Sequence, residues 1–152
     1  METKTLATNK RAGLRYEFLD KFEAGIELRG SEVKSLRQSK VDLSDSFVRI
    51  DNGEAFIHNL HISPYKQASY ENVSPLRIRK ILLHKQEIIK LFAKMKQKSL
   101  TIIPLSLYFN QTGRVKLNLA LAKGRRLYDQ REKIKKKEFL ARMQKIGVNK
   151  RM

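Results

Sequence analysis

The chain has 152 residues, of which 41% are hydrophobic, and this is enough for one domain with a packed core. It contains no cysteine, which excludes disulfides, thiolate metal sites and cysteine nucleophiles. Lysine and arginine outnumber aspartate and glutamate by 33 to 15, for a net charge of +18. Such a balance costs self-repulsion unless a polyanion neutralises it, so nucleic acid is the first candidate partner and an anionic membrane the second.

The positive charge is concentrated near the C-terminus. Residues 123–152 hold 12 basic and only 3 acidic side chains, so we expect a basic tail after a milder domain. The first residues show no apolar segment of the signal-peptide kind, and the longest apolar runs are too short to span a bilayer. Together with the absence of cysteine, this predicts a cytoplasmic protein without a membrane role.

A strand is predicted first. Residues 16–28 alternate between apolar and polar side chains, and Asp20 is the one break in the apolar series. A period of two residues predicts a strand with one buried face. Ahead of it stands the polar and basic cluster Asn9-Lys10-Arg11.

A short helix is predicted next, because the period changes at Gly30. Val33 and Leu36 stand three apart, and Ser31 can cap the helix before them. Glu32 falls in the first turn, where the helix dipole favours an anion. Three polar residues are left mostly off the apolar stripe and are expected to point outward: Lys34, Ser35 and Arg37. Taken alone, this pattern indicates a solvated surface helix.

The remaining elements follow from the same two periods. Asn52-Gly53 between apolar runs predicts a hairpin over residues 47–57, and two Ser-Pro pairs predict a loop over 63–75. Residues 83–97 have helical spacing, and strands follow over 100–109 and 115–121. In the first of these strands the parity shifts at Pro104, which indicates an edge or a bulge. The pattern predicts a mainly β fold with two or three helices, namely a small antiparallel β-barrel of the oligonucleotide-binding kind.

Catalytic motifs are weak. His58 and His61 have a ligand-like spacing but follow a strand pattern, which turns residues three apart to opposite faces. Glu23 and Glu27 could act as an acid and base pair, although an exposed charged face explains them better. The sequence has no phosphate-binding loop and no nucleophile elbow. We therefore predict a protein that is not an enzyme and that uses no metal or cofactor.

Basic residues near the last strand favour nucleic-acid binding. Arg114 and Lys116 precede the second half of the strand on its polar face, and Lys123-Gly124-Arg125-Arg126 follows it. Gly124 would let the backbone approach a ligand, and the flanking cations suit phosphates. Tyr70, Tyr108 and Tyr128 could stack on bases.

At these residues the sequence resembles the SsrA-binding protein family, also called SmpB. The resemblance covers nearly the whole chain and rests on six segments: Asn9–Ala12, Phe22–Gly25, Gly30–Arg37, Asp42–Phe47, Asp51–Phe56 and Leu121–Arg126. It implies an antiparallel β-barrel with a basic tail that binds the tRNA-like domain of transfer-messenger RNA. It also implies delivery of that RNA, with elongation factor Tu, to ribosomes stalled without a stop codon, and a monomer is expected.

The resemblance also assigns residues to roles. It implies an RNA-binding group in the folded domain: Asn9, Lys10, Arg11, Glu23, Glu32, Lys34, Ser35, Arg37, Arg114, Lys116, Lys123, Gly124, Arg125 and Arg126. It implies a tail group that enters the decoding centre and the messenger channel of the small subunit: Tyr128, Asp129, Arg131, Lys135, Lys136 and Lys137. Family members commonly carry lysine where this chain has Gln130, which weakens a role for that position.

Two questions stay open at this level. A glutamate in an RNA site cannot favour a phosphate, so Glu23 either accepts from a base or holds an arginine. The alternative to a rescue factor is a structural ribosomal protein whose basic extension is buried in ribosomal RNA. In either case we expect an RNA-binding domain over residues 1–127 and a tail over 128–152. The tail is expected to be disordered when free and helical when bound, because its apolar stripe is thin.

Overall fold

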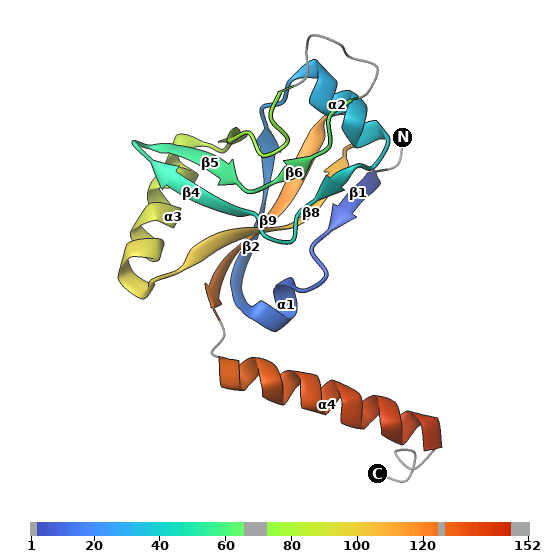
Figure 1. Ribbon diagram of the computed structural model, residues 1–152. Coiled ribbons are helices and arrows are strands. Elements are labelled where there is room, and N and C mark those ends of the chain that lie inside the picture. Colours follow the sequence, from blue (N-terminus) through green and yellow to red (C-terminus); the bar gives the residue numbers. More distant parts are fainter. Residues whose placement is uncertain (1–2, 66–72, 125–126, 147–152) are drawn as a thin grey trace.

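The computed structural model describes residues 3–65, 73–124 and 127–146 (Figure 1). One antiparallel sheet contains seven strands: β1 (Lys4–Thr8), β2 (Tyr16–Ile26), β4 (Phe47–Asp51), β5 (Glu54–His58), β7 (Arg79–Leu82), β8 (Thr101–Phe109) and β9 (Val115–Gly124). Six of them close a ring in the order β8-β4-β5-β7-β2-β9, because β9 also pairs with β8. β1 is added beside β8, and β3 (Val41–Asp42) with β6 (His61–Ile62) forms a separate two-stranded sheet.

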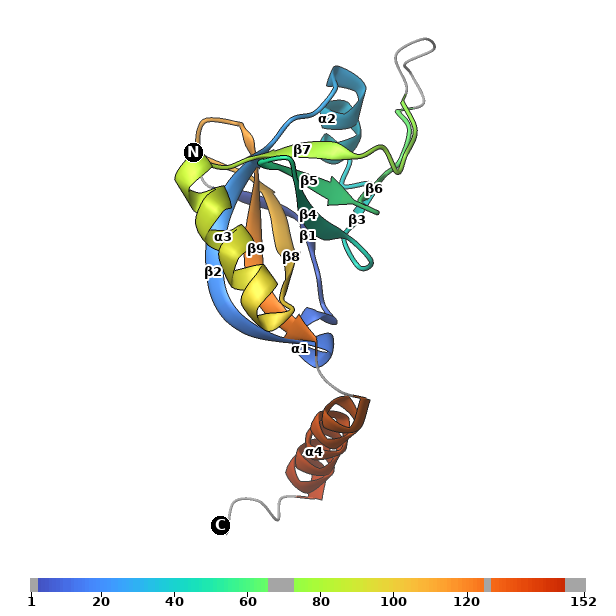
Figure 2. The same ribbon diagram turned by 90° about the vertical axis from the view of Figure 1, so that its left-hand side faces the viewer.

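Within the described residues, four helices accompany the strands: α1 (Ala12–Arg15), α2 (Gly30–Arg37), α3 (Lys85–Lys98) and α4 (Leu127–Ile146). Figures 1 and 2 place α2 and α1 at opposite ends of the ring, with α4 projecting beyond α1. The prediction of a mainly β fold made of antiparallel strands with a few helices is confirmed. The helix predicted over residues 83–97 is α3, two residues shorter at its start and one residue longer at its end.

The interior of the ring is the main core, and it is aliphatic. Every strand of the ring contributes to it, with side chains that are at most 8% exposed: Ala24, Ile26, Val48, Ala55, Ile57, Ile81, Ile102, Leu107, Leu117, Leu119 and Leu121. Burial of apolar side chains on this scale is the dominant favourable contribution to folding. Leu36 joins the same cluster from α2, so this helix is tied to the core and not merely laid on the surface.

The hairpin predicted at Asn52-Gly53 is confirmed. β4 and β5 pair from Phe47 opposite His58 to Asp51 opposite Glu54. Asn52 and Gly53 have φ values of 50° and 77°, the left-handed backbone that a two-residue hairpin turn requires. Asn and Gly adopt this conformation at the least cost, which is why the dipeptide identified the turn.

The prediction of one buried face for the strand at residues 16–28 is wrong. A bulge at Leu19 shifts the register of β2 against β9 between Phe18 and Asp20. Before the bulge, Tyr16 and Phe18 pack on a second small core outside the ring. After it, the apolar side chains face the main core. The break at Asp20 therefore marks a change of face, because one extra residue in a strand reverses the alternation.

The second core lies under α1. Ala12 from α1 packs there with Ile103, Ala120 and Ala122 from β8 and β9. The register of β8 against β9 also shifts, between Pro104 and Ser106. Of the two alternatives predicted at Pro104, an edge or a bulge, the structure therefore supports the bulge. The outer face of β2, β9 and β8 is consequently apolar near α1 and polar toward the other end of the ring.

The helix α2 begins differently from the prediction. Its N-cap is Arg29 and not Ser31, and the backbone N–H of Arg29 donates to Glu32 Oε1 at 2.8 Å. Glu32 does occupy the first turn, as predicted. Ser31 and Ser35 are both buried, so the expectation that Ser35 points outward is wrong. The reason is that Ser35 Oγ donates to the carbonyl of Ser63 on the neighbouring loop, at 2.5 Å.

Candidate nucleic-acid interface

The strand β9 runs from one end of the ring to the other and separates the predicted RNA-binding residues into two groups. Lys116 lies near its start and Lys123 near its end, a separation of roughly 23 Å along an extended strand. We call the first region the pocket end; it comprises α2, Gly25, Leu82, Arg114 and Lys116. We call the second region the tail end; it comprises α1, Lys123, Gly124 and the start of α4.

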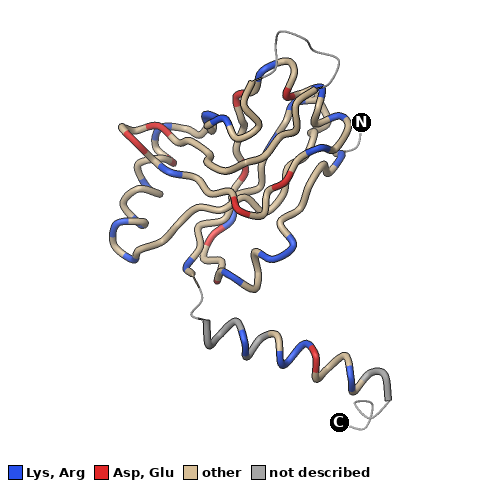
Figure 3. Tube along the Cα trace, in the orientation of Figure 1, with Lys and Arg blue, Asp and Glu red and all other residues tan. Residues whose placement is uncertain are grey.

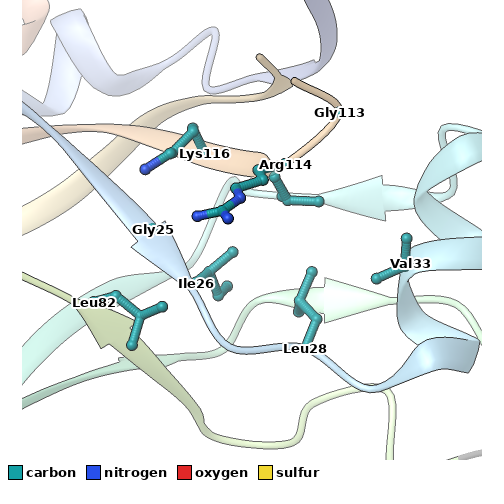
Figure 4. A pocket seen from close by; sticks show the side chains of 9 residues that line it. Gly25, Ile26, Leu28, Val33, Leu82, Gly113, Arg114 and Lys116 are labelled. Atoms are coloured by element: carbon teal, nitrogen blue, oxygen red, sulfur yellow. The ribbon is translucent and has the colours of Figure 1, made fainter. Parts of the chain in front are cut away.

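The pocket end contains a hollow of about 290 Å³. Its lining combines two cations with apolar side chains and two glycines: Gly25, Ile26, Leu28, Val33, Leu82, Gly113, Arg114, Val115 and Lys116. Figure 4 shows Arg114 and Lys116 on one side and Ile26, Leu28 and Leu82 on the other, with Val33 reaching in from α2. A hollow with a cationic side and an apolar side suits a nucleotide, which has a phosphate and a flat base or sugar.

Close packing between β2 and β7 shapes this hollow. Gly25 pairs with Leu82 across the two strands. A Cβ atom at Gly25 would lie 3.3 Å from the Cβ of Leu82, tighter than ordinary contact. Leu82 nevertheless remains 50% exposed and faces the hollow, so its side chain is open to a ligand.

The turn between β8 and β9 fixes the backbone of Arg114. Asn110 Oδ1 accepts from the backbone N–H groups of Thr112 and Arg114, at 3.1 and 2.9 Å. The backbone N–H of Asn110 donates in turn to the carbonyl of Arg114 at 2.9 Å. Gly113 completes the turn with a φ of 80°. The backbone of Arg114 is therefore held by an ordered turn, although the Arg114 side chain is exposed.

A polar cluster continues from the hollow over the outer face of β2, β9 and β8. Glu23 is opposite Asn118, and Tyr108 is opposite Lys116. The Tyr108 hydroxyl donates to Glu23 Oε2, and Asn118 Nδ2 donates to Ser106 Oγ at 2.9 Å. Burial, followed by the hydrogen bond to the Glu23 carboxylate, raises the pKa of Tyr108 to about 12. Because the Tyr108 side chain is buried, the expectation that its ring stacks on a base is wrong.

Glu32 lies inside the protein and not on the RNA face. It is 3% exposed, and its carboxylate accepts from Arg77 Nη2 at 2.6 Å and from Arg79 Nε at 2.5 Å. Arg79 is fully buried and also donates to the carbonyls of Leu60 and Pro75, at 2.6 and 3.1 Å. Burial raises the pKa of Glu32, but the Arg77, Arg29 and Arg79 donors outweigh it and hold that pKa below its usual value.

This network gives Glu32 and Ser35 a structural function. Together with the hydrogen bond from Ser35 to Ser63, the network joins α2 to β7 and to the segments on either side of residues 66–72, which lie outside the described part of the chain. Neither side chain is open to RNA contact in this fold. Lys34 and Arg37, on the same helix, are exposed and remain candidates. Lys34 Nζ lies 5.7 Å from the centre of the Tyr65 ring.

The tail end brings together residues from the two ends of the sequence. Tyr16 and Glu17 pair with Gly124 and Lys123, so β2 begins where β9 finishes. Lys10, just before α1, and Arg11, its N-cap, are exposed, as is Lys123. Asn9 instead binds β8, because its Nδ2 donates to the carbonyl of Pro104 at 3.1 Å.

The tail is helical in this structure. α4 contains Arg131 and Lys135–Lys137, all exposed, together with exposed Ile134, Phe139 and Leu140. Figure 3 shows that lysines and arginines occur at both ends of the ring and along α4. Tyr128, Asp129 and Gln130 belong to α4, but their side chains are not described, and Tyr70, Arg125 and Arg126 lie outside the described residues. Disorder of the free tail stays a prediction.

Other types of site have less support in the described part of the chain. No group of His, Asp and Glu side chains there could hold a metal ion, and His58 stacks on Phe47 with ring centroids 5.3 Å apart. A larger hollow of about 450 Å³ has an uncharged lining from the β4–β5 turn and α3, so it offers nothing to a phosphate. No helix in the described ranges has the length and apolar character needed to cross a membrane.

Sequence reasoning missed several features of the pocket end and of the polar cluster beside it. Leu82 belongs to an apolar run and carried no signal of exposure. Asn118 alternates with apolar residues and looked like any polar residue on a strand. Glu23 and Tyr108 are 85 positions apart in the sequence, and only the pairing of β2, β9 and β8 brings them into contact.

Known proteins are similar to this chain in sequence and in fold. Residues 6–149 match the model of the family described as SmpB protein. An SsrA-binding protein from Persephonella marina is 52% identical over 145 residues, covering 95% of each chain. One from Aquifex aeolicus is 55% identical, covering 87% of this chain and 84% of the relative. A solved chain described as "tmRNA-SmpB: a journey to the center of the bacterial ribosome" is 48% identical with a TM-score of 0.67, covering 84% of this chain and 93% of the other.

Proposed function

The chain belongs to the SmpB protein family, and we propose on that basis that it binds transfer-messenger RNA and brings it to stalled ribosomes for trans-translation. The names of its relatives support binding of that RNA, and the solved structure similar to it supports a ribosomal setting. The net charge of +18 and the cationic hollow are what such a role requires. We infer an RNA-binding function without catalysis, in the cytoplasm where ribosomes are found.

We propose that the pocket end holds the tRNA-like domain of the RNA. The observation that carries this is the hollow in which Arg114 and Lys116 stand beside exposed Leu82. The cations offer phosphate contacts, and the apolar side offers a surface for a base or ribose. Glu23 and the exposed Lys34 and Arg37 lie at the same end and extend the surface.

We propose that the tail end and α4 face the ribosome. This separates Lys10, Arg11 and Lys123 from the rest of the RNA-binding group that the resemblance implies. Lys10 and Arg11 adjoin α1, which contacts α4, and Lys123 is near the end of the strand before α4. The helix α4 itself carries three consecutive lysines. A tail of this kind suits a channel of ribosomal RNA, which supplies the counter-charge that a free helix lacks. The decoding centre and messenger channel as its destination, and elongation factor Tu as a further partner, rest on the family resemblance.

We also propose that the ring is a small barrel of the oligonucleotide-binding kind and that the protein is a monomer. The closed order of six strands supports the first proposal, since closure is what removes the edges of a sheet. Equilibrium sedimentation of the free protein and of its RNA complex tests the second, and one protein per RNA is expected.

Truncation tests the assignment of RNA binding to the ring and of ribosome contact to α4. Residues 1–127 contain the complete ring, so this fragment should bind the isolated tRNA-like domain about as tightly as the full chain does. It should fail to support tagging of incomplete peptides on stalled ribosomes, because α4 is gone. If the fragment is folded by circular dichroism but does not bind the RNA, the assignment of RNA binding to the ring is wrong.

A structural ribosomal protein is the competing function, and it predicts different behaviour on ribosomes. A structural component stays on purified subunits after a high-salt wash and is present once per subunit. A delivery factor washes off and is found only on stalled ribosomes. Quantitative immunoblotting of washed subunits and of ribosomes stalled on a message without a stop codon separates the two functions.

A further inference from the structure

The helix α3 buries one apolar face and leaves a second apolar strip in solvent. Ile88 and Leu91 are buried, at 7% and 6% exposure, and hold the helix to the ring. Ile89 and Phe92 are 60% and 41% exposed. Because the buried pair already secures the helix, folding does not require the exposed pair. An apolar strip of this kind, bordered by polar residues, is typical of a site that meets a partner.

A hollow of about 450 Å³ lies between this strip and the β4–β5 hairpin. Its lining consists of Ile88, Ile89, Phe92 and Ala93 from α3, and of Ile50 and the Asn52-Gly53 turn from the hairpin. The volume falls within the range of roughly 300–1,000 Å³ found for ligand sites. The four residues of α3 span about 7.5 Å of helix axis, which is long enough for apolar side chains from two successive turns of a second helix.

The charge around the hollow comes mainly from α3. This helix carries five lysines, all exposed, and one glutamate. Lys85 lies one turn before Ile89, and Lys96 lies one turn after Phe92, with its Nζ 4.7 Å from the centre of the Phe92 ring. Cations therefore stand at both ends of the apolar strip. They complement a partner that carries carboxylates beside its apolar side chains.

Like charge argues against an occupant from this same protein. The helix α4 has exposed apolar side chains of its own, but it carries seven basic residues against three acidic ones. A second copy of the chain would bring a net charge of +18 to a face that is already basic. The occupant that the charges favour is therefore an acidic segment of another protein.

RNA fits this hollow less well than an acidic protein segment does. The lining has no charged side chain, and exposed Asp51 and Glu54 flank the Asn52-Gly53 turn, where they would repel phosphates. The same two carboxylates require that the acidic residues of a partner lie on the α3 side. Figures 1 and 2 show α3 apart from both α2 and α4, so this face stays open when those helices are engaged.

We propose that the groove between α3 and the β4–β5 hairpin is a docking site for an acidic amphipathic helix of another protein. Apolar residues of that helix, spaced i, i+3, i+4 and i+7, enter the hollow beside Ile89 and Phe92, and its carboxylates pair with the lysines of α3. This interaction goes beyond the proposed function, because Arg114, Lys116 and α4 take no part in it.

A synthetic peptide of about 18 residues, or five helical turns, tests the groove in the full-length protein. The peptide has leucines at i, i+3, i+4 and i+7 and glutamates on either side of them. Titration into the isotope-labelled protein should shift backbone amide signals of residues 85–98 and 50–55. Two control peptides should bind at least tenfold more weakly: one with the same leucines spread around the helix, and one with lysine in place of each glutamate.

Variants of α3 separate the apolar contribution from the charge. Ile89→Gln with Phe92→Gln should lower affinity for the acidic peptide at least tenfold and leave the melting temperature nearly unchanged, since both side chains are exposed. Ile78→Gln is the matched control, because Ile78 is 53% exposed but does not line the hollow, and it should bind normally. Lys85→Glu with Lys96→Glu should weaken the acidic peptide and strengthen the lysine peptide.

Several results would overturn the docking site. Equal binding of the three peptides, or amide shifts away from α3 and the hairpin, would show that the groove does not select an acidic helix. Displacement of the peptide by an unstructured oligouridine, with shifts of the same α3 signals, would make the groove an RNA site. A dimer in sedimentation that Phe92→Gln dissociates would make it an interface between copies.

Binding of the tRNA-like domain is a separate readout. The variant with Ile89→Gln and Phe92→Gln should bind a transcript of that domain as the wild type does, because the groove lies outside the pocket end. Failure of the wild type to bind the transcript would overturn the proposed function and leave the docking site in place. A loss of transcript binding in this variant alone would assign the groove to RNA and overturn the docking site.

Discussion

At the pocket end, exposed functional side chains stand on a buried network of charges, whereas at the tail end they stand on a small apolar cluster. Glu32, Arg77 and Arg79 fix α2 beside the hollow, with Glu32 and Arg79 almost completely buried. Beneath α1 the support is Ala12, Ile103, Ala120 and Ala122. A buried charge network holds one geometry and tolerates little change, while a small alanine-rich contact fixes less. A fixed geometry suits the pocket end, which presents a shaped hollow. A less constrained contact suits the tail end, which leads into α4.

The largest expected effect comes from breaking the network at the pocket end. Glu32→Ala leaves Arg79 buried and without its carboxylate, so the free energy of unfolding should fall by about 3–5 kcal/mol. Arg37→Ala on the same helix is the control, since Arg37 is exposed, and it should change stability by less than about 0.5 kcal/mol. Urea unfolding measures both. Equal losses would mean that α2 is held by packing and not by this network.

The same network has a pH signature. The pKa of Glu32 lies below its ordinary value of 4.5 in the folded protein, so its contribution to stability is complete above that value. The contribution is lost as the pH falls through the lowered pKa. Unfolding curves from pH 6 down to pH 2 should therefore converge for the wild type and Glu32→Gln. If the difference in stability between the two proteins stays constant down to the lowest pH, the ionised carboxylate is not its cause.

The next effect tests the tail end. A proline in the middle of a helix costs about 3 kcal/mol, and in a coil almost nothing. Lys137→Pro should leave binding of the isolated tRNA-like domain intact and abolish tagging of stalled peptides, because α4 cannot form on the ribosome. Lys137→Ala removes the charge but keeps the helix, and it should tag normally. If both variants lose tagging equally, the tail contributes charge; if neither does, its helix is not used.

A smaller effect compares the cations of the two ends. Replacing Arg114 and Lys116 together by glutamine should weaken binding of the tRNA-like domain roughly ten- to a hundredfold and flatten its salt slope by about two. The matched change of Lys10 and Lys123 to glutamine should leave that slope unaltered, because the tail end faces the ribosome. Filter binding across a salt series measures both. If the salt slope falls equally for the two double variants, the tRNA-like domain contacts both ends of the ring.

The smallest effect uses one glycine from each end. Gly25→Ala places a Cβ 3.3 Å from that of Leu82 and should cost about 1 kcal/mol of stability, with a few-fold loss of RNA affinity as the hollow changes shape. Gly124→Ala meets nothing within 4 Å and should be neutral or slightly stabilising. Thermal unfolding and RNA titration of the two variants give the comparison. A neutral Gly25→Ala would show that β7 can move to admit the methyl group.

Much of the fold follows from local pattern. The Asn52-Gly53 hairpin, the helix α3 and an irregularity of the strand at Pro104 were predicted because each has a short-range physical cause. The basic residues of the candidate site were also predictable, since the excess of positive charge and the positions of lysine and arginine can be read from the sequence. What periodicity misjudged is the strand at residues 16–26: the break at Asp20 was visible, but a break alone does not say that the strand changes faces.

The sequence by itself determined the longer strands and helices, the basic balance and the family, because these depend on residue types and on neighbours along the chain. The short elements β1, α1 and β7 were not predicted. Only the tertiary structure decided which polar residues are available. Glu23 and Glu32 look alike in the sequence, yet one is exposed beside Tyr108 and the other is buried against Arg79. Each partner lies 85 or 47 positions away, and no local pattern reports a contact that chain folding creates. The physical reason is that burial is a property of the closed ring, which places some strand and helix positions inside and leaves their neighbours in water.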